Sequence, residues 1–453
     1  MQKLITKYGL AAHLALLAVA PLFLSPAWVL WLSALGAIWL IMEPSRIGEE
    51  MLHEARRRVA GEIVRDPFFW VSLALVAFAA LRWVNGGITM VYDAENTTWS
   101  LHPPRFEILP GSVSGFGAVE FCASVAMVVV LQGGRHALGK SARWAFFLIS
   151  SFLASLAAIR LSVAMFYGDA DVLRQSACPV SDPVHIGMAF GVYSLVAMMA
   201  LLAAFERKWR KSMPLALIAV IGNAAGLFLF APSFVVAAFG AVSVVLFLYA
   251  FTYARMALPG SGAFKFLVAF GMSLVVAGVI AVAVLPESSL PGKLSPFKTG
   301  LFWTPDYLSL REAVSGIAMK VWKAHPWIGS GLGSFPLDIK FLATEQDWSV
   351  IATERTPTLN GYWLLLSERG IIGAFAVACP LCLLLWTYGV RMVKGVMCRT
   401  LPHPASWMAL LLLLALAACG VLDTTILFPG IMLSVAMVLA ISANSFPKEK
   451  HHG

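Results

Sequence analysis

Residues 207–257 read RKWRKSMPLALIAVIGNAAGLFLFAPSFVVAAFGAVSVVLFLYAFTYARMA, and this stretch decides the fold class. Two apolar runs, 213–231 and 233–253, follow a cluster of Lys and Arg residues and meet at a proline. Each run has about the 20 residues that an α-helix needs to cross a ~30 Å hydrocarbon core. Strands of a membrane barrel alternate apolar and polar residues, and these runs do not, so the sequence predicts membrane-spanning helices.

The rest of the chain has the same character. Of its 453 residues, 59% are hydrophobic and only 13% are charged, whereas about 25% of the residues of a soluble domain are charged. The mean hydropathy is +0.80. We therefore expect an all-α, polytopic integral membrane protein that forms a single membrane domain over residues 1–453. Its twelve predicted spans are 8–25, 27–43, 67–85, 114–132, 144–167, 186–205, 213–231, 233–253, 265–285, 371–390, 405–421 and 425–443.

The Lys and Arg residues lie mainly in the short segments between these runs. With the N-terminus in the cytoplasm, 21 of them lie in cytoplasmic segments, and only Arg82, Arg105, Arg160 and Arg174 lie in or beside short outer segments. Because cytoplasmic loops carry such an excess of basic residues, we predict that both termini are cytoplasmic. Residues 286–370, between the ninth and tenth spans, then form a large periplasmic loop.

This distribution also explains the formal net charge of +9. It indicates topology and contact with anionic membrane lipids rather than a nucleic-acid partner. Of the six cysteines only Cys178 falls in a predicted outer loop, so the sequence predicts no disulfide framework. The pair Cys379 and Cys382 has the spacing of a metal motif but lies inside a span without further ligands. We predict neither a metal nor a cofactor.

Residues 46–65 mix Glu49, Glu50 and Glu54 with three consecutive arginines. A basic loop that sets the topology is the expected interpretation, because such clusters are usual in cytoplasmic loops. An amphipathic helix on the cytoplasmic membrane surface is the alternative.

Two arginines near the outer ends of spans are candidate binding residues. A charged side chain at the depth of the bilayer is unfavourable, so Arg82 and Arg160 are functional candidates. Two guanidiniums would suit a phosphate or pyrophosphate group, which Arg binds through two hydrogen bonds. The alternative is that each side chain extends to lipid headgroups from a helix end.

The predicted periplasmic loop holds the most informative pattern of the chain. Arg311 lies in the first turn of a predicted helix, 308–324, and residues 322–335 then read WKAHPWIGSGLGSF. Gly329, Gly331 and Gly333 alternate beside a proline, a spacing that lets backbone amides approach an anion, although it is also typical of a simple turn. Residues 358–373 follow, reading TLNGYWLLLSERGIIG, with Asn360 and Glu368.

In this order, residues 311–373 resemble the O-antigen ligase and O-antigen polymerase superfamily of membrane glycosyltransferases. Members of that family show an Arg before a Trp-containing helix and a Pro-containing turn with the pattern Gly-x-Gly-x-Gly/Asn-x-Phe. A His-Asn pair and a Glu-x-Gly segment at the start of the next span follow. Twelve helices with the main outer loop between the ninth and tenth also match the ligases.

The resemblance implies an enzyme of the bacterial inner membrane that needs no metal. It would transfer or polymerise glycan from an undecaprenyl-pyrophosphate carrier to a lipid or glycan acceptor during surface polysaccharide and lipopolysaccharide assembly. Arg311 would stabilise the departing pyrophosphate. Asn360 matches the Asn of the His-Asn pair, and Glu368 matches the conserved position of the Glu-x-Gly segment.

Two positions depart from the family pattern. Leu359 stands where the family has His, and Phe234 stands where it has an Arg in an outer turn. Leucine cannot move a proton and phenylalanine cannot pair with a phosphate. Substitutes of the right chemistry lie elsewhere in the chain. Glu354, Glu345, Asp347 or His325 would replace the base, and Arg160, Arg82 or Arg355 would replace the missing Arg.

Several interpretations therefore stay open. The chain is an active, divergent transferase with a substitute base, or it binds the lipid-linked glycan without turning it over, or the alignment register of the motif differs. A secondary transporter is the alternative of a different class, since twelve spans with both ends inside is a common transporter plan. Transporters usually show two related halves and polar residues at the midplane. Here Asn223 is the main polar residue within a span, and helix packing explains it.

Overall fold

The computed structural model describes most of the helical residues of the chain and part of its loops. The description covers residues 2–22, 24, 26–42, 52–93, 98–113, 115–167, 183–206, 211–231, 233–257, 262–284, 305–345, 347, 360–397, 404–422, 435–436 and 438.

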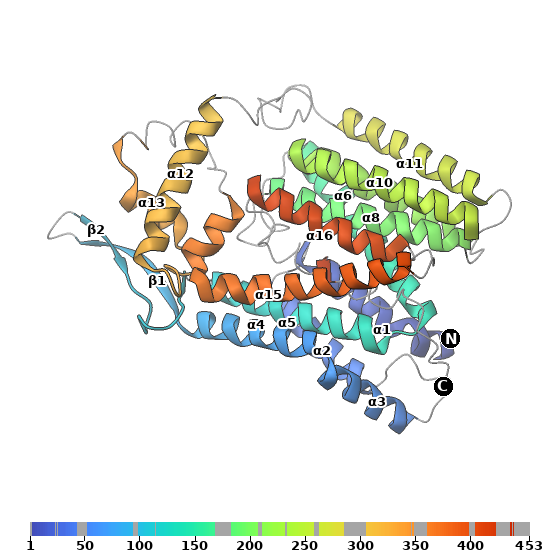
Figure 1. Ribbon diagram of the computed structural model, residues 1–453, viewed down its shortest axis with the longest axis horizontal. Coiled ribbons are helices and arrows are strands. Elements are labelled where there is room, and N and C mark those ends of the chain that lie inside the picture. The colour runs from blue at the N-terminus through green and yellow to red at the C-terminus, as the bar shows by residue number, and fades with distance from the viewer. Residues whose placement is uncertain are drawn as a thin grey trace.

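Helices make up nearly all of the secondary structure (Figure 1). The membrane-type helices of the first half are α1 (Gln2–Val19), α2 (Pro26–Met42), α4 (Pro67–Val84), α5 (Phe116–Gln132), α6 (Lys140–Tyr167) and α8 (Pro183–Glu206). Those of the second half are α9 (Met213–Phe230), α10 (Ser233–Ala257), α11 (Gly262–Val284), α15 (Gly361–Met397) and α16 (Pro404–Leu422). The remaining elements are η1 (Ala20–Leu22), α3 (Leu52–Arg65), β1 (Gly86–Asp93), β2 (Thr98–His102), β3 (Ser112–Val113), η2 (Gly133–Ala137), α12 (Pro305–Ala324) and α13 (Phe335–Leu342).

The chain is a mostly helical membrane protein. Among the described residues, seven helices are long and apolar enough to cross a bilayer, and four more apolar helices are shorter. Each of the first eleven predicted spans corresponds to one of these eleven helices. The twelfth, 425–443, lies almost entirely outside the described residues, so the span count and the orientation of the termini stay predictions.

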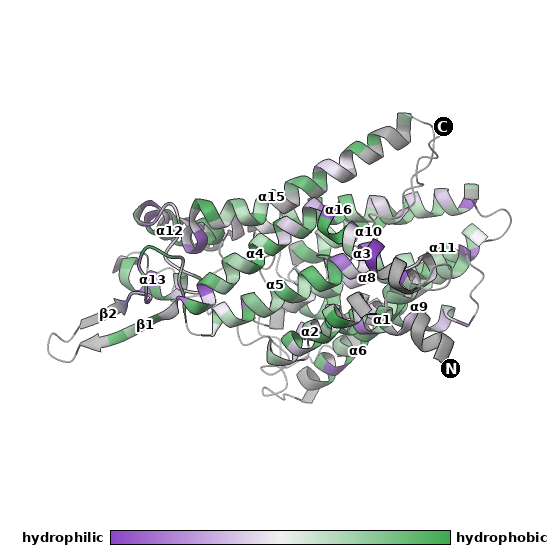
Figure 2. Ribbon diagram, turned by 90° about the horizontal axis from the view of Figure 1, so that it is seen from below, coloured by the Kyte–Doolittle hydropathy of each residue, from purple (hydrophilic) through white to green (hydrophobic). Residues whose placement is uncertain are grey.

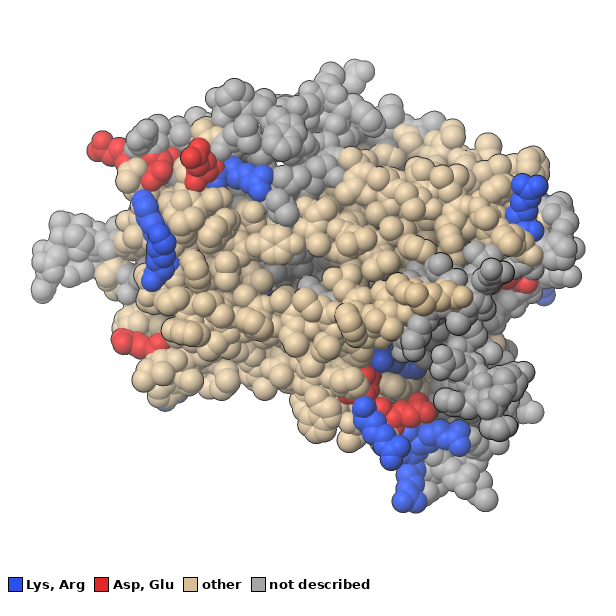
Figure 3. Space-filling view, viewed as in Figure 1, with Lys and Arg blue, Asp and Glu red and all other residues tan. Residues whose placement is uncertain are grey.

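The two ends of the bundle differ. The start of α1 and helix α3 lie at one end, which we call the α3 end, and β1, β2, α12 and α13 lie at the other, which we call the hairpin end (Figure 1). Hydrophobic residues colour the long helices between them, whereas hydrophilic residues gather over α3 and α12 (Figure 2). Lys and Arg side chains gather over α3, and the middle of the molecule shows almost no charge (Figure 3).

Helix α8 occupies the centre of the bundle. It packs against α6, α9 and α10, and 89% of its apolar window is buried. Small residues allow close helix packing: a Cβ added to Gly222 of α9 would lie 2.6 Å from Ser155 of α6. The neighbouring Asn223 is fully buried and donates to the carbonyl of Ser151 on α6 at 2.8 Å. Asn223 therefore packs two helices together, as the sequence predicts.

Of residues 46–65 the structure describes 52–65, and these do not form the loop that the sequence favours. Leu52–Arg65 is a helix, α3, with Val59 buried and Arg57 and Arg58 exposed, so the helix of the alternative is amphipathic as predicted, while its place on the cytoplasmic membrane surface stays a prediction. Its spacing places Val59 and Ile63 on one face, and that face packs against the apolar core.

Asp66, directly after α3, joins three segments at the α3 end. Its carboxylate accepts from the amide of Phe68 at 3.1 Å and so caps α4. Its Oδ2 atom lies 3.1 Å from Nε of Arg135 and 3.0 Å from Nε2 of His136, both in η2. Burial alone raises the pKa of Asp66, but the hydrogen bond to His136 and the charge of Arg135 more than offset it, so that this pKa lies below its ordinary value.

Two segments that the sequence predicts as loops are ordered. Residues 86–113 contain a three-stranded sheet in the order β2-β1-β3, in which β1 pairs antiparallel with β2 and parallel with β3. The prediction of an all-α fold misses this sheet because it rests on apolar runs long enough to span a bilayer, and β1, with 8 residues, is shorter than such a run. Helix α15 begins at Gly361, but its backbone is non-helical at Gly370, where two helical segments meet at a kink. Glu368 and Arg369 therefore end the first segment, and the second begins at residue 371, the predicted start of the tenth span. The predicted helix 308–324 is confirmed as α12.

Candidate functional site

Three charged side chains from three helices meet at the hairpin end. Arg82 of α4 is fully buried, and its Nη1 lies 3.2 Å from Oε2 of Glu120 on α5. Nη1 of Arg369 on α15 lies 2.7 Å from Oε1 of the same glutamate, whose side chain is 13% exposed. One carboxylate therefore forms ion pairs with two buried guanidiniums. We call Arg82, Glu120 and Arg369 the charge triad.

Arg82 also holds backbone segments in place. Its Nη2 donates to the carbonyl of Glu368 at 3.2 Å, and its Nε donates to the carbonyl of Gly111 at 3.4 Å. The hydroxyl of Ser112 donates in turn to the carbonyl of Arg82 at 2.9 Å. A single arginine thus joins the end of α4 to the segment before α5 and to the start of α15.

The glycine-rich turn of the loop docks against α15 at its kink around Gly370. The amides of Ser330 and Gly331 donate to the carbonyls of Ser367 and Glu368, at 2.8 and 3.2 Å. In the opposite direction, the amides of Ile371 and Ile372 donate to the carbonyls of Pro326 and Trp327, at 2.9 and 3.1 Å. These four backbone hydrogen bonds join two segments that lie about 40 positions apart, and we call the contact the turn clamp.

Two glycines make this close approach possible. Gly329 has φ of +74° and Gly370 has φ of +62°, a region that L-residues with a Cβ rarely adopt. A Cβ on Gly329 would lie 2.3 Å from the carbonyl carbon of Glu368, and one on Gly370 would lie 2.4 Å from that of Trp327. A Cβ on Gly331 would overlap the side chain of Ile88, and one on Gly333 would overlap the ring of Phe116. In this structure the alternating glycines pack against the protein, and their role in anion binding stays a prediction.

Glu368 is buried beside the charge triad and contacts α13. Its Oε1 accepts from the amide of Phe335, the first residue of α13, at 3.4 Å. A carboxylate at a helix N-terminus meets unpaired amides and the positive end of the helix dipole. Glu368 therefore connects the turn clamp to α13, while its backbone carbonyl accepts from Arg82.

A second polar cluster lies on the other side of the turn. Oδ2 of Asp338, on α13, accepts from the hydroxyls of Ser330 and Ser334, at 2.8 and 3.1 Å. The two hydroxyls are 2.7 Å apart, and Ser330 also lies 3.3 Å from the carbonyl of Ser367. Burial raises the pKa of Asp338 above its ordinary value, against the opposite effect of the two serine hydroxyls.

Asn360, a predicted catalytic residue, caps α15. Its Oδ1 accepts from the amide of Tyr362 at 2.9 Å, and its carbonyl accepts from the amide of Leu364 at 3.0 Å. Asn is among the favoured residues at this position. The capping geometry explains the residue type without a substrate.

We expect Asn360→Ala to lower the free energy of unfolding by about 1 kcal/mol, because the first turn of α15 loses its cap. Asn360→Asp keeps an acceptor for Tyr362 and should restore the stability. The measurement is thermal unfolding of the purified variants in detergent. Equal unfolding temperatures for the alanine and aspartate variants would contradict the capping role.

The other predicted residues are not gathered at one point. Arg311 is half-buried on α12, and Arg160 is exposed on α6, a helix that packs on α1, α8 and α9. No hydrogen bond or ion pair between described residues joins either of them to the charge triad. Phe234 lies in the first turn of α10. Glu354, Arg355 and Leu359 lie outside the described residues.

The proposed substitute bases differ in exposure and contacts. His325 follows the end of α12 and is exposed, as is Glu345. Oδ2 of Asp347 accepts from the amide and the hydroxyl of Thr344, at 2.9 and 2.8 Å. The amide hydrogen bond contributes most to holding the pKa of Asp347 below its ordinary value, which makes it a weaker base.

Sequence reasoning missed Glu120 and Asp338. Glu120 is the only acidic residue of an apolar span, and a lone ionisable residue in a span is a functional candidate by that fact alone. Asp338 carries no such signal, because an acid in the first turn of a short helix is ordinary. Its burial comes from the docking of α13 on α12 and α15.

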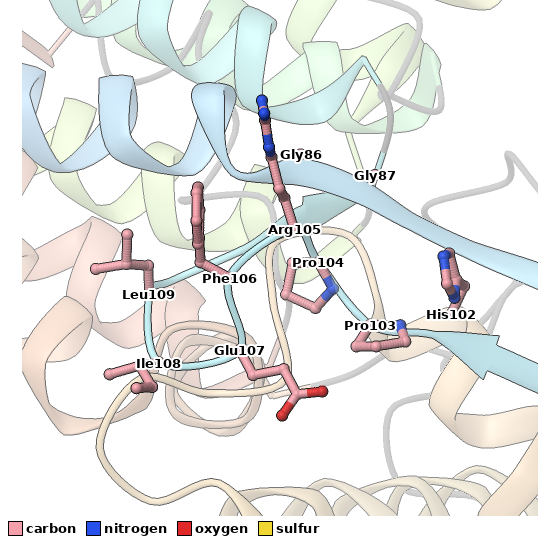
Figure 4. Close-up of a pocket in the computed structure, with 10 residues that line it drawn as sticks. All are labelled: Gly86, Gly87, His102, Pro103, Pro104, Arg105, Phe106, Glu107, Ile108 and Leu109. Carbon is pink, nitrogen blue, oxygen red and sulfur yellow. The ribbon is translucent and has the colours of Figure 1, made fainter.

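A cavity of about 960 Å³ lies beside β1 and β2 at the hairpin end (Figure 4). His102, Arg105 and Glu107 line it, and Asn85 holds its wall by donating to the carbonyls of Phe106 and Leu109, both at 2.9 Å. Arg105 and Glu107 point to opposite sides of the loop (Figure 4). Polar groups that do not converge are not typical of a specific small-molecule site.

Among the described residues, no three His, Cys, Asp or Glu side chains lie close enough together to hold a metal ion. Compared with known proteins, the chain matches no protein-family model and no curated protein.

Proposed function

We propose that the protein is a membrane glycosyltransferase of the O-antigen ligase-like class in the bacterial inner membrane. Its substrate would be a glycan on an undecaprenyl-pyrophosphate carrier, and its product a transferred or polymerised glycan on a lipid or glycan acceptor. The hairpin end, which carries the motif of the loop, would face the periplasm.

The turn clamp is the observation that carries this proposal. The resemblance rests on two separate pieces of sequence, the glycine-rich turn and the segment at the start of α15. Four backbone hydrogen bonds join these pieces, and α12, which carries Arg311, packs against α15. Pieces that form one structural unit are more informative than separate matches, because a chance resemblance does not require them to meet.

Arg311 has the role of stabilising the pyrophosphate as it leaves. One further negative charge develops on the pyrophosphate when its bond to the sugar breaks, and a guanidinium placed there lowers the barrier. Arg82 and Arg369 share Glu120 and are buried, so we assign them to holding the loop against the helices rather than to the leaving group.

A binding protein without turnover is the second candidate. Leu359 and Phe234 favour it, because neither side chain can perform the role of the His or Arg that the family has there. Such a protein would present the lipid-linked glycan to another enzyme. It would need the same Arg311 but no base.

The test is complementation in a strain that lacks its own copy of the gene, with surface glycan as the readout. We expect wild type to restore the glycan and Arg311→Ala to abolish it. Lys320→Ala is the matched control, because Lys320 is an exposed cation on the same helix. If wild type and both variants restore the surface glycan, Arg311 has no role in the mechanism.

Purified protein separates the two candidates. The transferase in proteoliposomes should release undecaprenyl pyrophosphate from a lipid-linked glycan extract, whereas a binding protein should retain the glycan without release. If folded protein neither binds nor consumes the extract, the proposal fails. Uptake of solute driven by an ion gradient in the same vesicles would indicate the transporter instead.

A further inference from the structure

Asp338 is a buried carboxylate, and the charge of His325 acts on it and favours its ionised form. Its exposed fraction is 7%, and no Lys or Arg of the described part of the chain forms an ion pair with it. Two other buried or half-buried acids differ: Asp66 pairs with Arg135 and His136, and Glu120 pairs with two arginines. Glu368 is also buried without an ion pair, but its carboxylate lies at the N-terminus of α13 and accepts from the amide of Phe335. A buried charge is costly unless it is paired, so a buried carboxylate that forms no ion pair with Lys or Arg calls for an explanation.

The two serines orient this carboxylate and leave one oxygen for another partner. Ser330 and Ser334 both donate to Oδ2. No hydrogen bond from a described residue reaches Oδ1. A carboxylate fixed through one oxygen presents the other in a defined direction, which is the arrangement that proton transfer requires.

The position of Asp338 ties it to the turn clamp. Ser330 lies between Gly329 and Gly331 in the glycine-rich turn, and its amide and hydroxyl both contact the carbonyl of Ser367. The carboxylate is therefore fixed to the part of the loop that carries the motif. At the same time Leu359 removes the group that accepts the proton in the family.

We infer that Asp338 is the proton acceptor of the reaction, in place of the absent histidine; this inference rests on the proposed function. The acceptor hydroxyl oxygen forms a bond to the anomeric carbon of the glycan as the bond from that carbon to the pyrophosphate oxygen breaks. The hydroxyl proton passes to Oδ1 of Asp338, and the electron pair of the broken bond leaves on the pyrophosphate. The protonated carboxyl then returns its proton to water.

Burial gives Asp338 the properties of a useful base. Its pKa lies above the ordinary value for Asp, mainly because burial disfavours the charged form, so it accepts a proton more readily than Asp347 does. The same shift determines its effect on stability. Because the pKa is higher in the folded state than in the unfolded state, ionised Asp338 destabilises the fold at neutral pH.

The experiment compares wild type with Asp338→Asn in proteoliposomes, using lipid-linked glycan and acceptor lipids extracted from the source cells. We expect the transfer rate of the variant to fall about 100-fold or more. The wild-type rate should rise with pH through the pKa of Asp338, and this acid limb should disappear in the variant. Glu312→Gln, an exposed acid of α12, is the control and should keep both the rate and the pH profile.

Thermal unfolding separates a catalytic from a structural role. The asparagine amide oxygen still accepts from the two serines while the buried charge is removed, so the unfolding temperature should stay the same or rise. An asparagine variant that loses stability in parallel with activity would overturn the inference. A variant whose transfer rate stays within about 3-fold of wild type would also overturn the inference, because that change corresponds to less than about 1 kcal/mol of activation free energy.

Ser330→Ala provides a second, independent readout. Its hydroxyl lowers the pKa of Asp338, so its removal should move the acid limb of the rate profile to higher pH. If the acid limb of the Ser330→Ala rate profile stays at the wild-type pH, the assignment of Asp338 is wrong, even if the asparagine variant does not fold. Failure of the proposed function is distinguishable, because wild type itself would then transfer no glycan.

Discussion

Glu120→Gln is expected to unfold the hairpin end of the protein more readily than any other charge-neutralising change in the described residues. The substitution removes the carboxylate shared by Arg82 and Arg369, whose side chains are 0% and 6% exposed. Removing one partner of a buried ion pair costs about 3–5 kcal/mol, because the remaining charge has no compensation. Here two guanidiniums lose their shared ion-pair partner at once, and the electrostatic attraction of the nearby Glu368 remains.

The measurement is the apparent unfolding temperature of the purified protein in detergent, which should fall by roughly 10 °C. Glu107→Gln is the matched control, since Glu107 is an exposed acid at the same end of the molecule. It should change the unfolding temperature little, because isolated surface charges contribute about 0–1 kcal/mol.

A double variant tests the mechanism of this loss. If uncompensated charge is the cause, Glu120→Gln combined with Arg369→Gln should be more stable than Glu120→Gln alone. A double variant that is less stable than the single one would show that Arg369 stabilises the fold by contacts other than Glu120. The charge triad would then not act as a unit.

The positions of the helices were predictable because membrane spans depend on local composition. A run such as 213–231 must be helical wherever it lies in the chain, since a bilayer leaves backbone groups no other partner. The hairpin of β1 and β2 was not predictable in the same way. Its residues, including Tyr92 and Trp99, pair across strands, and a scan for long apolar runs does not detect such pairing.

The candidate site was predictable only in part. The glycine-rich turn and the segment around Glu368 were identified as one motif, and the structure brings them together. Glu120 was missed because its partners, Arg82 and Arg369, lie 38 and 249 positions away in the chain. Sequence gives the cost of a charge inside a span, but only the packing of α4, α5 and α15 shows what compensates it.

Gly370→Ala is expected to separate the turn from α15. The residue has φ of +62°, and an added Cβ would lie 2.4 Å from the carbonyl carbon of Trp327 and 2.5 Å from the amide nitrogen of Ile328. Both are backbone atoms that are fixed by the turn clamp, so no side-chain rotation relieves the overlap. Backbone strain of about 1–2 kcal/mol adds to an overpacking cost of about 1–3 kcal/mol.

Two glycines of the same end of the molecule serve as matched controls that separate strain from overlap. Gly87 has φ of +117° with open space around its Cβ position, so Gly87→Ala tests the strain alone. Gly316 lies within α12 and also has open space, so Gly316→Ala should be neutral or stabilise by about 1 kcal/mol through higher helix propensity. The expected order of unfolding temperatures is therefore Gly316→Ala highest, Gly87→Ala intermediate and Gly370→Ala lowest.

Limited proteolysis locates the change. When the turn clamp opens, the four hydrogen bonds between the turn and α15 are lost, and the segment around Trp327, already 65% exposed, becomes accessible to a protease. Cleavage should therefore increase near residues 325–334 in Gly370→Ala and not in Gly316→Ala. Gly329→Ala should reproduce the result, because its Cβ would meet the carbonyl carbon of Glu368 from the opposite side of the same contact. Cleavage at an unchanged rate in both clamp variants would show that the turn is held by α12 and α13 rather than by the clamp.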